Sequence, residues 1–153
     1  MKNSIVLQGK GSQSIGMLSD LSSNFSIVSE IFQEASDALG VDLWKIAQED
    51  QEALNLTENT QPIMLAAGYA TYKVLSSEVE LAPEFMAGHS LGEYTALVAA
   101  ESLNFFDAVK LVRNRAELMQ SAVPSGSGSM AAILGLDDEK VVEICSQSSF
   151  HGI

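Results

Sequence analysis

The sequence predicts an α/β protein in which helices pack around a few short strands. Its 153 residues are 46% hydrophobic with a mean hydropathy of +0.14, which is enough for one core of ordinary domain size. Aromatic residues make up only 7% of the chain, and the apolar content is carried by aliphatic side chains that favour helices. Short apolar runs followed by glycine-containing turns supply the strands.

The chain is acidic, with a formal net charge of −12 and an isoelectric point near 4.3. This charge repels phosphate backbones, so we exclude nucleic acid as a partner. The N-terminal apolar run is too short for a signal peptide, and no stretch approaches the ~20 apolar residues of a membrane span. We therefore expect a cytoplasmic protein that does not bind membranes.

A single cysteine, Cys145, is present. The sequence thus offers no intrachain disulfide and no set of thiolate ligands for a metal ion. We interpret Cys145 as a packed helix residue and expect neither a metal nor a resident cofactor.

The first elements follow from hydrophobic periodicity. Residues 5–7 (Ile-Val-Leu) are expected to form a short buried strand, and two glycines permit a tight loop at 8–13. A short helix is expected at 16–21 and a longer one at 27–39, where apolar residues recur at helical spacing. Gly40 then ends the longer helix.

Two further helices are expected before the middle of the chain. Asp42 is expected to cap a short helix that extends to Trp44. Thr60 is typical of an N-cap and Pro62 of a first helical position, so the next helix is expected to begin there and to continue its apolar stripe to Val74.

The middle of the chain predicts a strand, a tight turn and a helix in succession. Residues 85–87 form the strand, 88–92 (Gly-His-Ser-Leu-Gly) the turn and 93–100 the helix. A further helix opens near Asp107.

Residues 124–129 (Pro-Ser-Gly-Ser-Gly-Ser) are rich in turn formers and are expected to divide the chain into units 1–124 and 129–153. In the second unit, 130–134 is expected to be a strand. Asp137 is expected to cap the helix that follows.

The turn at 88–92 fits the pattern G-x-S-x-G, in which a serine occupies a strained bend between strand and helix. Ser90 is therefore a candidate nucleophile. The N–H of Leu91 would lie near a helix N-terminus, where developing negative charge is stabilised. An ordinary tight turn is the alternative.

A serine nucleophile needs a base, and the chain has two histidines. His89 directly precedes Ser90, and consecutive residues do not project to the same side of a turn. His151 lies two residues from the C-terminus, where fraying is expected. Neither is a convincing partner for Ser90.

A cation interrupts the apolar stripe of the helix near Asp107. Arg115 stands at the centre of this stripe. A buried guanidinium needs an anion, and its planar fork suits a carboxylate. A structural salt bridge, or a charged end that reaches solvent, is the alternative. Arg113 differs, since Glu117 offers it a surface pair four residues on. The apolar members of the stripe are Ala108, Leu111, Leu118 and Ala122.

Four segments extend these motifs. They are 9–13 (Gly-Lys-Gly-Ser-Gln), 60–62 (Thr-Gln-Pro), 88–96 (Gly-His-Ser-Leu-Gly-Glu-Tyr-Thr-Ala) and 130–133 (Met-Ala-Ala-Ile). Together, and in this order, they resemble the malonyl-CoA:acyl-carrier-protein transacylases over nearly the whole chain. The longer form GHSLGEY is far more specific than G-x-S-x-G.

The resemblance implies an activity and its partners. In that family the serine matching Ser90 takes malonyl from malonyl-CoA and passes it to the phosphopantetheine thiol of acyl carrier protein, by a ping-pong mechanism in fatty acid synthesis. The residue matching Arg115 binds the free carboxylate of malonyl. Backbone N–H groups at Lys10 and Leu91 match the oxyanion hole. Gln61 matches a glutamine near the site, with a simple helix-start role as the alternative.

The first loop departs from the family pattern. Family members usually read Phe-Pro-Gly-Gln-Gly-Ser-Gln where residues 7–13 read Leu-Gln-Gly-Lys-Gly-Ser-Gln. Gln8 thus replaces a proline and Lys10 a glutamine. A backbone donor survives a change of side chain, so the resemblance still implies an oxyanion hole here. Lys10 could attract an anionic substrate, and sequence drift in a damaged gene copy explains it equally well.

Length is the larger departure, because family members continue past this point and carry their catalytic histidine there. His151 does not match it. The implied fold is an α/β-hydrolase-like core with a small ferredoxin-like subdomain, of which 1–124 and 129–153 would be the beginnings. We expect the isolated chain to lack turnover. The alternatives are a polyketide-synthase acyltransferase module, a plain esterase that needs no Arg115, and an inactive truncated fragment.

Overall fold

The structure is a computed structural model of the chain. It divides into two compact units, Met1–Ala122 and Val123–Ile153. The residues that the structure describes are 3–9, 11–122, 124 and 133–148.

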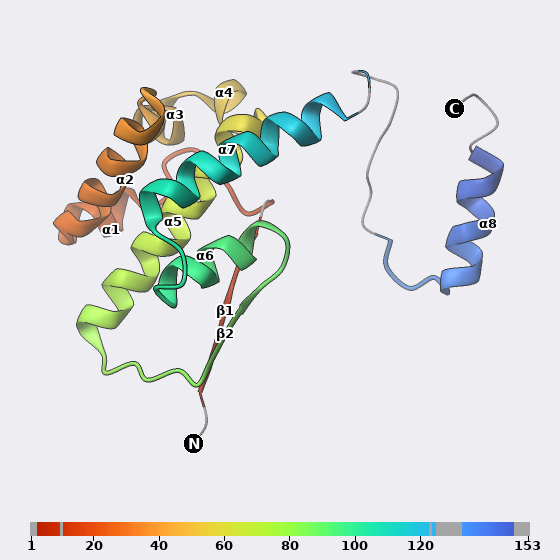
Figure 1. Ribbon diagram of the computed structural model, residues 1–153. Helices are drawn as coiled ribbons and strands as arrows, with labels where there is room; N and C mark the ends of the chain where they lie inside the picture. Colours follow the sequence, from red (N-terminus) through yellow and green to blue (C-terminus); the bar gives the residue numbers. More distant parts are fainter. Residues whose placement is uncertain (1–2, 10, 123, 125–132, 149–153) are drawn as a thin grey trace. The chain divides into compact units, whose positions relative to one another are not determined.

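The first unit mixes helices and strands and is mostly helical, as the α/β class predicts (Figure 1). Its elements, in chain order, are β1 (Ser4–Leu7), α1 (Ser19–Asn24), α2 (Ser26–Leu39), α3 (Leu43–Glu49), α4 (Gln51–Asn55), α5 (Thr57–Glu78), β2 (Phe85–Gly88), α6 (Leu91–Ala99) and α7 (Phe105–Ser121).

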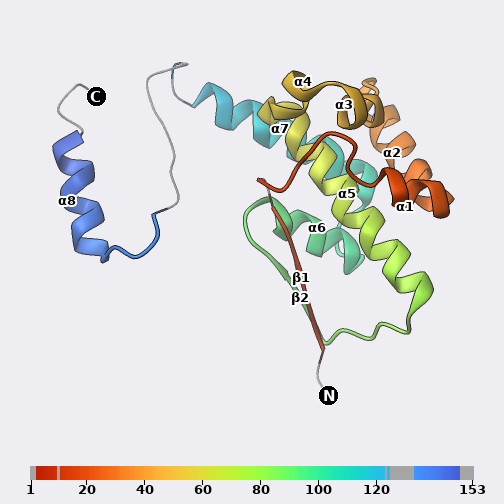
Figure 2. The same ribbon diagram turned by 180° about the vertical axis from the view of Figure 1, so that it is seen from behind.

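The core of this unit lies among its helices. Helices α2, α5 and α7 pack against one another, and the two views in Figures 1 and 2 show them side by side. The ring of Phe32, fully buried, meets that of Trp44 edge to face at 4.9 Å. Apolar residues at helical spacing thus close one hydrophobic core, as their periodicity predicts. The buried residues of α2 are Val28, Ile31, Phe32 and Ala35.

The strands β1 and β2 pair in parallel, with Ile5 opposite Met86. Helix α6 packs against both strands and also contacts α5 and α7, so it joins the strand pair to the helices. The side chains of the pair alternate between half-buried and exposed, and Val6 is 74% exposed. The strand at 5–7 is confirmed, but the expectation that it is buried is wrong, because only one face of the pair is covered by helices.

Several expected boundaries shift in the structure. The short helix expected at 16–21 begins at Ser19 instead, since Gly16 and Leu18 both have positive φ angles of 77° and 63°, which no helix accepts. Asp42 caps α3 as predicted, with its Oδ1 accepting from Lys45 N at 2.9 Å. That helix continues to Glu49, well past the expected end.

Helix α5 begins at Thr57, three residues before the expected N-cap. Thr60 is a buried residue inside the helix, where its hydroxyl donates to the carbonyl oxygens of Leu54 and Leu56. Pro62 accordingly lies within the helix. A proline there has no N–H to give the carbonyl four residues earlier, that of Glu58.

The second unit contains α8 (Asp138–Ser148), which confirms the helix expected after Asp137. The strand expected at 130–134 falls mostly outside the described residues, and its last two positions, Ile133 and Leu134, are not in a strand. Cys145 is exposed and not packed as expected.

Candidate active site

Ser90 occupies the bend between β2 and α6. Its φ and ψ are 54° and −110°, a conformation that costs a non-glycine residue about 1–3 kcal/mol. A Cβ on Gly88 would lie 2.0 Å from the backbone carbon of Gly92, and one on Gly92 would lie 2.2 Å from the Leu7 carbonyl oxygen. Both glycines of the motif therefore permit contacts that no side chain allows. The predicted strand, turn and helix are confirmed, with α6 beginning at Leu91 and not at 93.

Arg115 reaches Ser90 from α7. Its Nη2 donates to Ser90 Oγ at 2.9 Å, and its Nη1 donates to Gln61 Oε1 at 2.6 Å. The guanidinium carbon lies 5.6 Å from the ring centre of Tyr94. Helix α5, helix α6 and the bend at Ser90 thus each place one side chain around the guanidinium that α7 carries. None of the ion pairs among the described residues includes Arg115.

The apolar stripe that singled out Arg115 as a cation on the core face is partly wrong. The buried residues of α7 are Phe105, Ala108, Val109, Val112 and Ala116. Of the expected apolar stripe only Ala108 is buried, while Leu111 and Leu118 are 45% and 63% exposed. The true core face is rotated by roughly a quarter turn about the helix axis. Arg115 therefore flanks the core, where a charged group can reach a site open to solvent.

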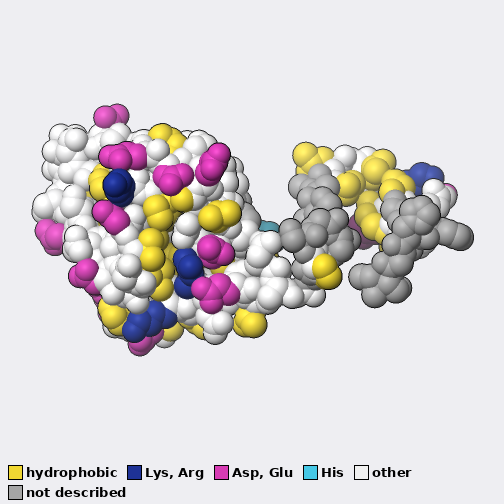
Figure 3. All heavy atoms as spheres, turned by 90° about the horizontal axis from the view of Figure 1, so that it is seen from above, with side chains coloured by type: hydrophobic (Ala, Val, Ile, Leu, Met, Phe, Trp, Pro, Cys, Tyr) yellow, Lys and Arg dark blue, Asp and Glu magenta, His cyan; other side chains and the backbone are white. Residues whose placement is uncertain are grey.

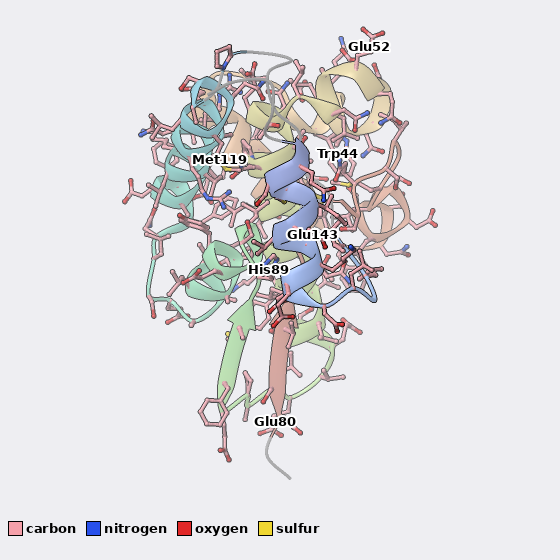
Figure 4. All side chains as sticks on the ribbon, turned by 90° about the vertical axis from the view of Figure 1, so that its right-hand side faces the viewer. Trp44, Glu52, Glu80, His89, Met119 and Glu143 are labelled. Atoms are coloured by element: carbon pink, nitrogen blue, oxygen red, sulfur yellow. The ribbon has the colours of Figure 1, made fainter. Side chains whose placement is uncertain are left out.

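Gln61 is buried, with 1% of its surface exposed. Its Oε1 accepts from Arg115, and its Nε2 donates to Met119 Sδ at 3.6 Å. Figure 4 shows Met119 on α7. The helix-start role for Gln61 is wrong, because α5 begins four residues earlier. Gln61 instead connects α5 to the guanidinium at Ser90.

The first loop runs beside the Ser90 bend. A Cβ on Gly9 would lie 3.0 Å from the His89 carbonyl oxygen and 3.9 Å from Leu91 N. Leu91 N–H stands in the first turn of α6, where the helix itself offers no partner. Lys10, the other expected backbone donor, lies outside the described residues.

A hollow of about 440 Å³ opens at the carboxyl ends of the strands, next to the bend at Ser90. Ligands of parallel sheets bind at this edge. Figure 4 shows His89 where β2 ends. The residues that line the hollow are Val6, Leu7, Gln8, Gly9, Gly11, Ser12 and His89.

The structure describes one of the two histidines. His89 is exposed and makes no hydrogen bond to Ser90, as the sequence predicts. His151 lies outside the described residues. Within the described part of the chain, Ser90 therefore has a cationic donor but no histidine base.

Arg113 holds a position that the sequence did not reveal. Its Nε donates to Glu117 Oε1 at 2.7 Å, which confirms the expected pair. Its Nη1 also donates to the Glu58 carbonyl oxygen at 3.2 Å and to Asn59 Oδ1 at 2.9 Å. Within α5, Pro62 deprives that carbonyl of its helical donor, and the expected placement of Pro62 at the helix start concealed this loss.

The surface around these residues carries scattered charge. Figure 3 shows acidic side chains (magenta) distributed over the visible face of the first unit.

No described helix is long and apolar enough to cross a membrane. Among the described residues no three His, Cys, Asp or Glu side chains come together as metal ligands.

Residues 5–149 match the family model of the acyl transferase domain, and the chain belongs to that family. A malonyl CoA-acyl carrier protein transacylase from Haemophilus influenzae is 53% identical over 149 residues, 96% of this chain and 48% of that protein. One from Escherichia coli is 50% identical over 145 residues, 94% of this chain and 47% of that protein. The chain thus spans about half the length of these curated relatives.

Solved structures agree with this assignment. FabD from Acinetobacter baumannii, 57% identical, superposes with a TM-score of 0.89 over 97% of this chain and 47% of that one. A type II PKS acyl-carrier protein in complex with its malonyl-transacylase gives a TM-score of 0.92 at 46% identity, over all of this chain and 50% of the matched one. The fold of the described residues is therefore that of the FabD acyltransferases.

Proposed function

We propose that the chain supplies the nucleophile and the carboxylate clamp of an acyl-carrier-protein S-malonyltransferase. The observation that carries this is the guanidinium of Arg115, which donates to both Ser90 Oγ and Gln61 Oε1. A serine beside a fixed cation suits an acyl group that bears a second, negative end.

In the first half-reaction, Ser90 Oγ attacks the thioester carbonyl of malonyl-CoA. The hydroxyl proton passes to a base, the carbon–sulfur bond breaks, and coenzyme A leaves as the thiol. In the second half-reaction, the phosphopantetheine thiol of acyl carrier protein attacks the malonyl ester, and the serine hydroxyl is restored. The strained bend exposes Oγ to both thiols.

Arg115 supplies selectivity for malonyl. In a malonyl ester of Ser90, one methylene group separates the ester carbonyl from the free carboxylate. In the free site the guanidinium donates to Ser90 Oγ. In the ester it is within reach of the free carboxylate, which replaces the hydroxyl as its acceptor and can accept two parallel hydrogen bonds. Gln61 is buried and accepts a hydrogen bond from Nη1, so it keeps the guanidinium in position while the acceptor of Nη2 changes.

Negative charge on the carbonyl oxygen requires backbone donors. The N–H of Leu91 points from the first turn of α6, where the helix dipole also favours an anion. The N–H of Lys10 is the proposed second donor, on the loop whose Gly9 lies against the bend. Gln8, which replaces the family's proline in this loop, is exposed, and this replacement leaves the backbone donors unaffected.

The base is proposed to come from the part of the family's fold that this chain does not share. Relatives at about half identity are about twice as long. We therefore propose that 1–124 belongs to the large subdomain of the transferase and 129–153 to the start of the small one. The isolated chain is then a nucleophile without its base, and we expect no sustained transfer from it.

A polyketide destination for the malonyl group is a second candidate. The observation behind it is the similarity to a malonyl-transacylase that was solved with a type II PKS acyl-carrier protein. The TM-score of 0.92 does not separate the two candidates, because FabD from Coxiella burnetii gives the same value. The chemistry at Ser90 would be unchanged. Transfer rates to a fatty-acid carrier protein and to a polyketide carrier protein separate the two candidates.

A chimera tests the proposed clamp. The 149 residues that match the Haemophilus influenzae relative replace the corresponding half of that enzyme, and transfer from malonyl-CoA and acetyl-CoA to carrier protein is measured. Arg115→Ala is expected to reduce malonyl transfer about 100-fold, because the malonyl carboxylate loses its charged partner. Acetyl transfer, which uses no carboxylate, is expected to change less than about threefold.

Lys110→Ala is the matched control. Lys110 is a cation of the same helix, and its ammonium group lies over the ring of Phe106, 4.1 Å from the ring centre. It is expected to leave both rates unchanged. An Arg115→Ala enzyme that still prefers malonyl contradicts the clamp, and efficient hydrolysis of uncharged esters that is insensitive to Arg115→Ala favours the esterase.

A further inference from the structure

We infer that Arg113 is a positioning residue for Arg115, and that it acts by taking the place of the N–H that Pro62 lacks. This inference deepens the proposed function, on which its catalytic consequence rests. The structural link itself stands on contacts between α5 and α7.

The link begins with a defect inside α5. Pro62 lies within the helix, and a proline at that position leaves the Glu58 carbonyl without its donor from four residues on. A backbone oxygen in that position is costly to bury unpaired. Arg113 Nη1 donates to it at 3.2 Å.

The same guanidinium is fixed by three further acceptors. Nη1 also donates to the side chain of Asn59, which is 7% exposed, at 2.9 Å. Nε donates to Glu117 at 2.7 Å, and Nη2 lies 3.9 Å from a carboxylate oxygen of Glu58. The Arg113 side chain is 25% exposed. It therefore ties α7 to the first turn of α5 through backbone as well as side-chain atoms.

This tie lies beside the site. Gln61, the α5 partner of Arg115, directly precedes Pro62, and Arg115 follows Arg113 by two residues on α7. Both arginines of α7 thus bond to the start of α5, Arg113 at 58–59 and Arg115 at Gln61. The register between α5 and α7 that Arg113 sets is the register that brings Arg115 to Gln61 and to Ser90.

The test uses the chain as it is and needs no acyl transfer. Arg113→Met removes the guanidinium but keeps an apolar stem. Pro62→Ala restores an N–H to the Glu58 carbonyl. Glu117→Gln is the control, because it weakens only the exposed partner of Arg113.

The first readout is urea unfolding of the four chains in the Arg113–Pro62 cycle. Arg113→Met is expected to lower the folding equilibrium constant about tenfold with Pro62 present. In the Pro62→Ala background it is expected to lower that constant only about threefold, since the new N–H then serves the carbonyl. Equal effects in the two backgrounds overturn the link.

The second readout reports the position of Arg115. The chain has two arginines, so the Arg113→Met chain shows a single arginine Nε–H signal in a ¹H–¹⁵N spectrum, that of Arg115. This signal is expected to shift relative to the intact chain and to return toward its original place in Arg113→Met/Pro62→Ala. Glu117→Gln is expected to leave it in place.

The double variant separates a change in the position of Arg115 from the effect of losing the Arg113 charge on its signal, because both variants lack that charge. An Arg115 signal that is the same in the intact chain and in Arg113→Met overturns the positioning role. So does a shift that the double variant fails to reverse. Either result leaves the proposed malonyl transfer untouched, while failure of the Arg115→Ala selectivity test leaves the Arg113 link untouched.

Discussion

The helices and the strand pair of the first unit carry similar apolar sequences but bury them to different extents. Phe32 of α2 is fully buried, whereas Phe85 of β2 is 63% exposed. The strands are covered by α6 on one face only. From this difference we expect the helices to contribute most of the stability of the described unit, while the strand pair positions the bend at Ser90.

The site spans the boundary between these two regions. Ser90 and Leu91 come from the end of the strand pair, whereas Gln61 and Arg115 come from the helices. Ser90, the proposed nucleophile, thus stands on a weakly covered element, and the side chains proposed to orient the substrate stand on well-packed helices. In the proposed reaction this division leaves the nucleophile open to two bulky thiols.

The largest expected effect contrasts two phenylalanines. Phe32→Ala removes a fully buried ring packed on Trp44 and is expected to lower the free energy of unfolding by about 3–5 kcal/mol. Phe85→Ala removes an exposed ring and is expected to cost less than about 1 kcal/mol. Urea unfolding followed by circular dichroism measures both. Similar costs would mean that the strand pair is as important for stability as the helices.

A smaller effect is expected from two glycines. Gly88→Ala places a Cβ 2.0 Å from the Gly92 backbone and is expected to lower the unfolding free energy by about 2–3 kcal/mol. A Cβ at Gly40 would have no atom within 4 Å, so Gly40→Ala is strained only by the left-handed φ of 66°, at a cost of about 1 kcal/mol. The same unfolding assay ranks them. The reverse order would show that the close approach at the Ser90 bend is relaxed in solution.

Much of the fold was predictable because its signals are local. The periodicity of α2, the stop at Gly40 and the cap at Asp42 each involve neighbours in sequence, and all are confirmed. The start of α5 was not predictable in this way. Thr60 and Pro62 imitate a helix start, but burial of Thr60 and its bonds to Leu54 and Leu56 place them inside the helix.

Sequence patterns singled out residues that the structure brings together, but not the contacts that support them. The G-x-S-x-G spacing identified Ser90, and a cation out of place in an apolar pattern identified Arg115. The pairing of Arg113 with the Glu58 carbonyl joins positions 55 residues apart. No local pattern predicts such a contact, since it depends on the register of two packed helices. The face of α7 was misjudged for the same reason, because packing against α2 and α5 selects the buried side.

Ser90 is proposed to be the residue that carries malonyl. Peptide mapping by mass spectrometry, after the chimera is mixed with malonyl-CoA and no carrier protein, tests this directly. We expect a malonyl group on the peptide that contains Ser90, removed by acyl carrier protein and absent from Ser90→Ala. A malonyl group on any other residue, or one that persists in Ser90→Ala, would contradict it.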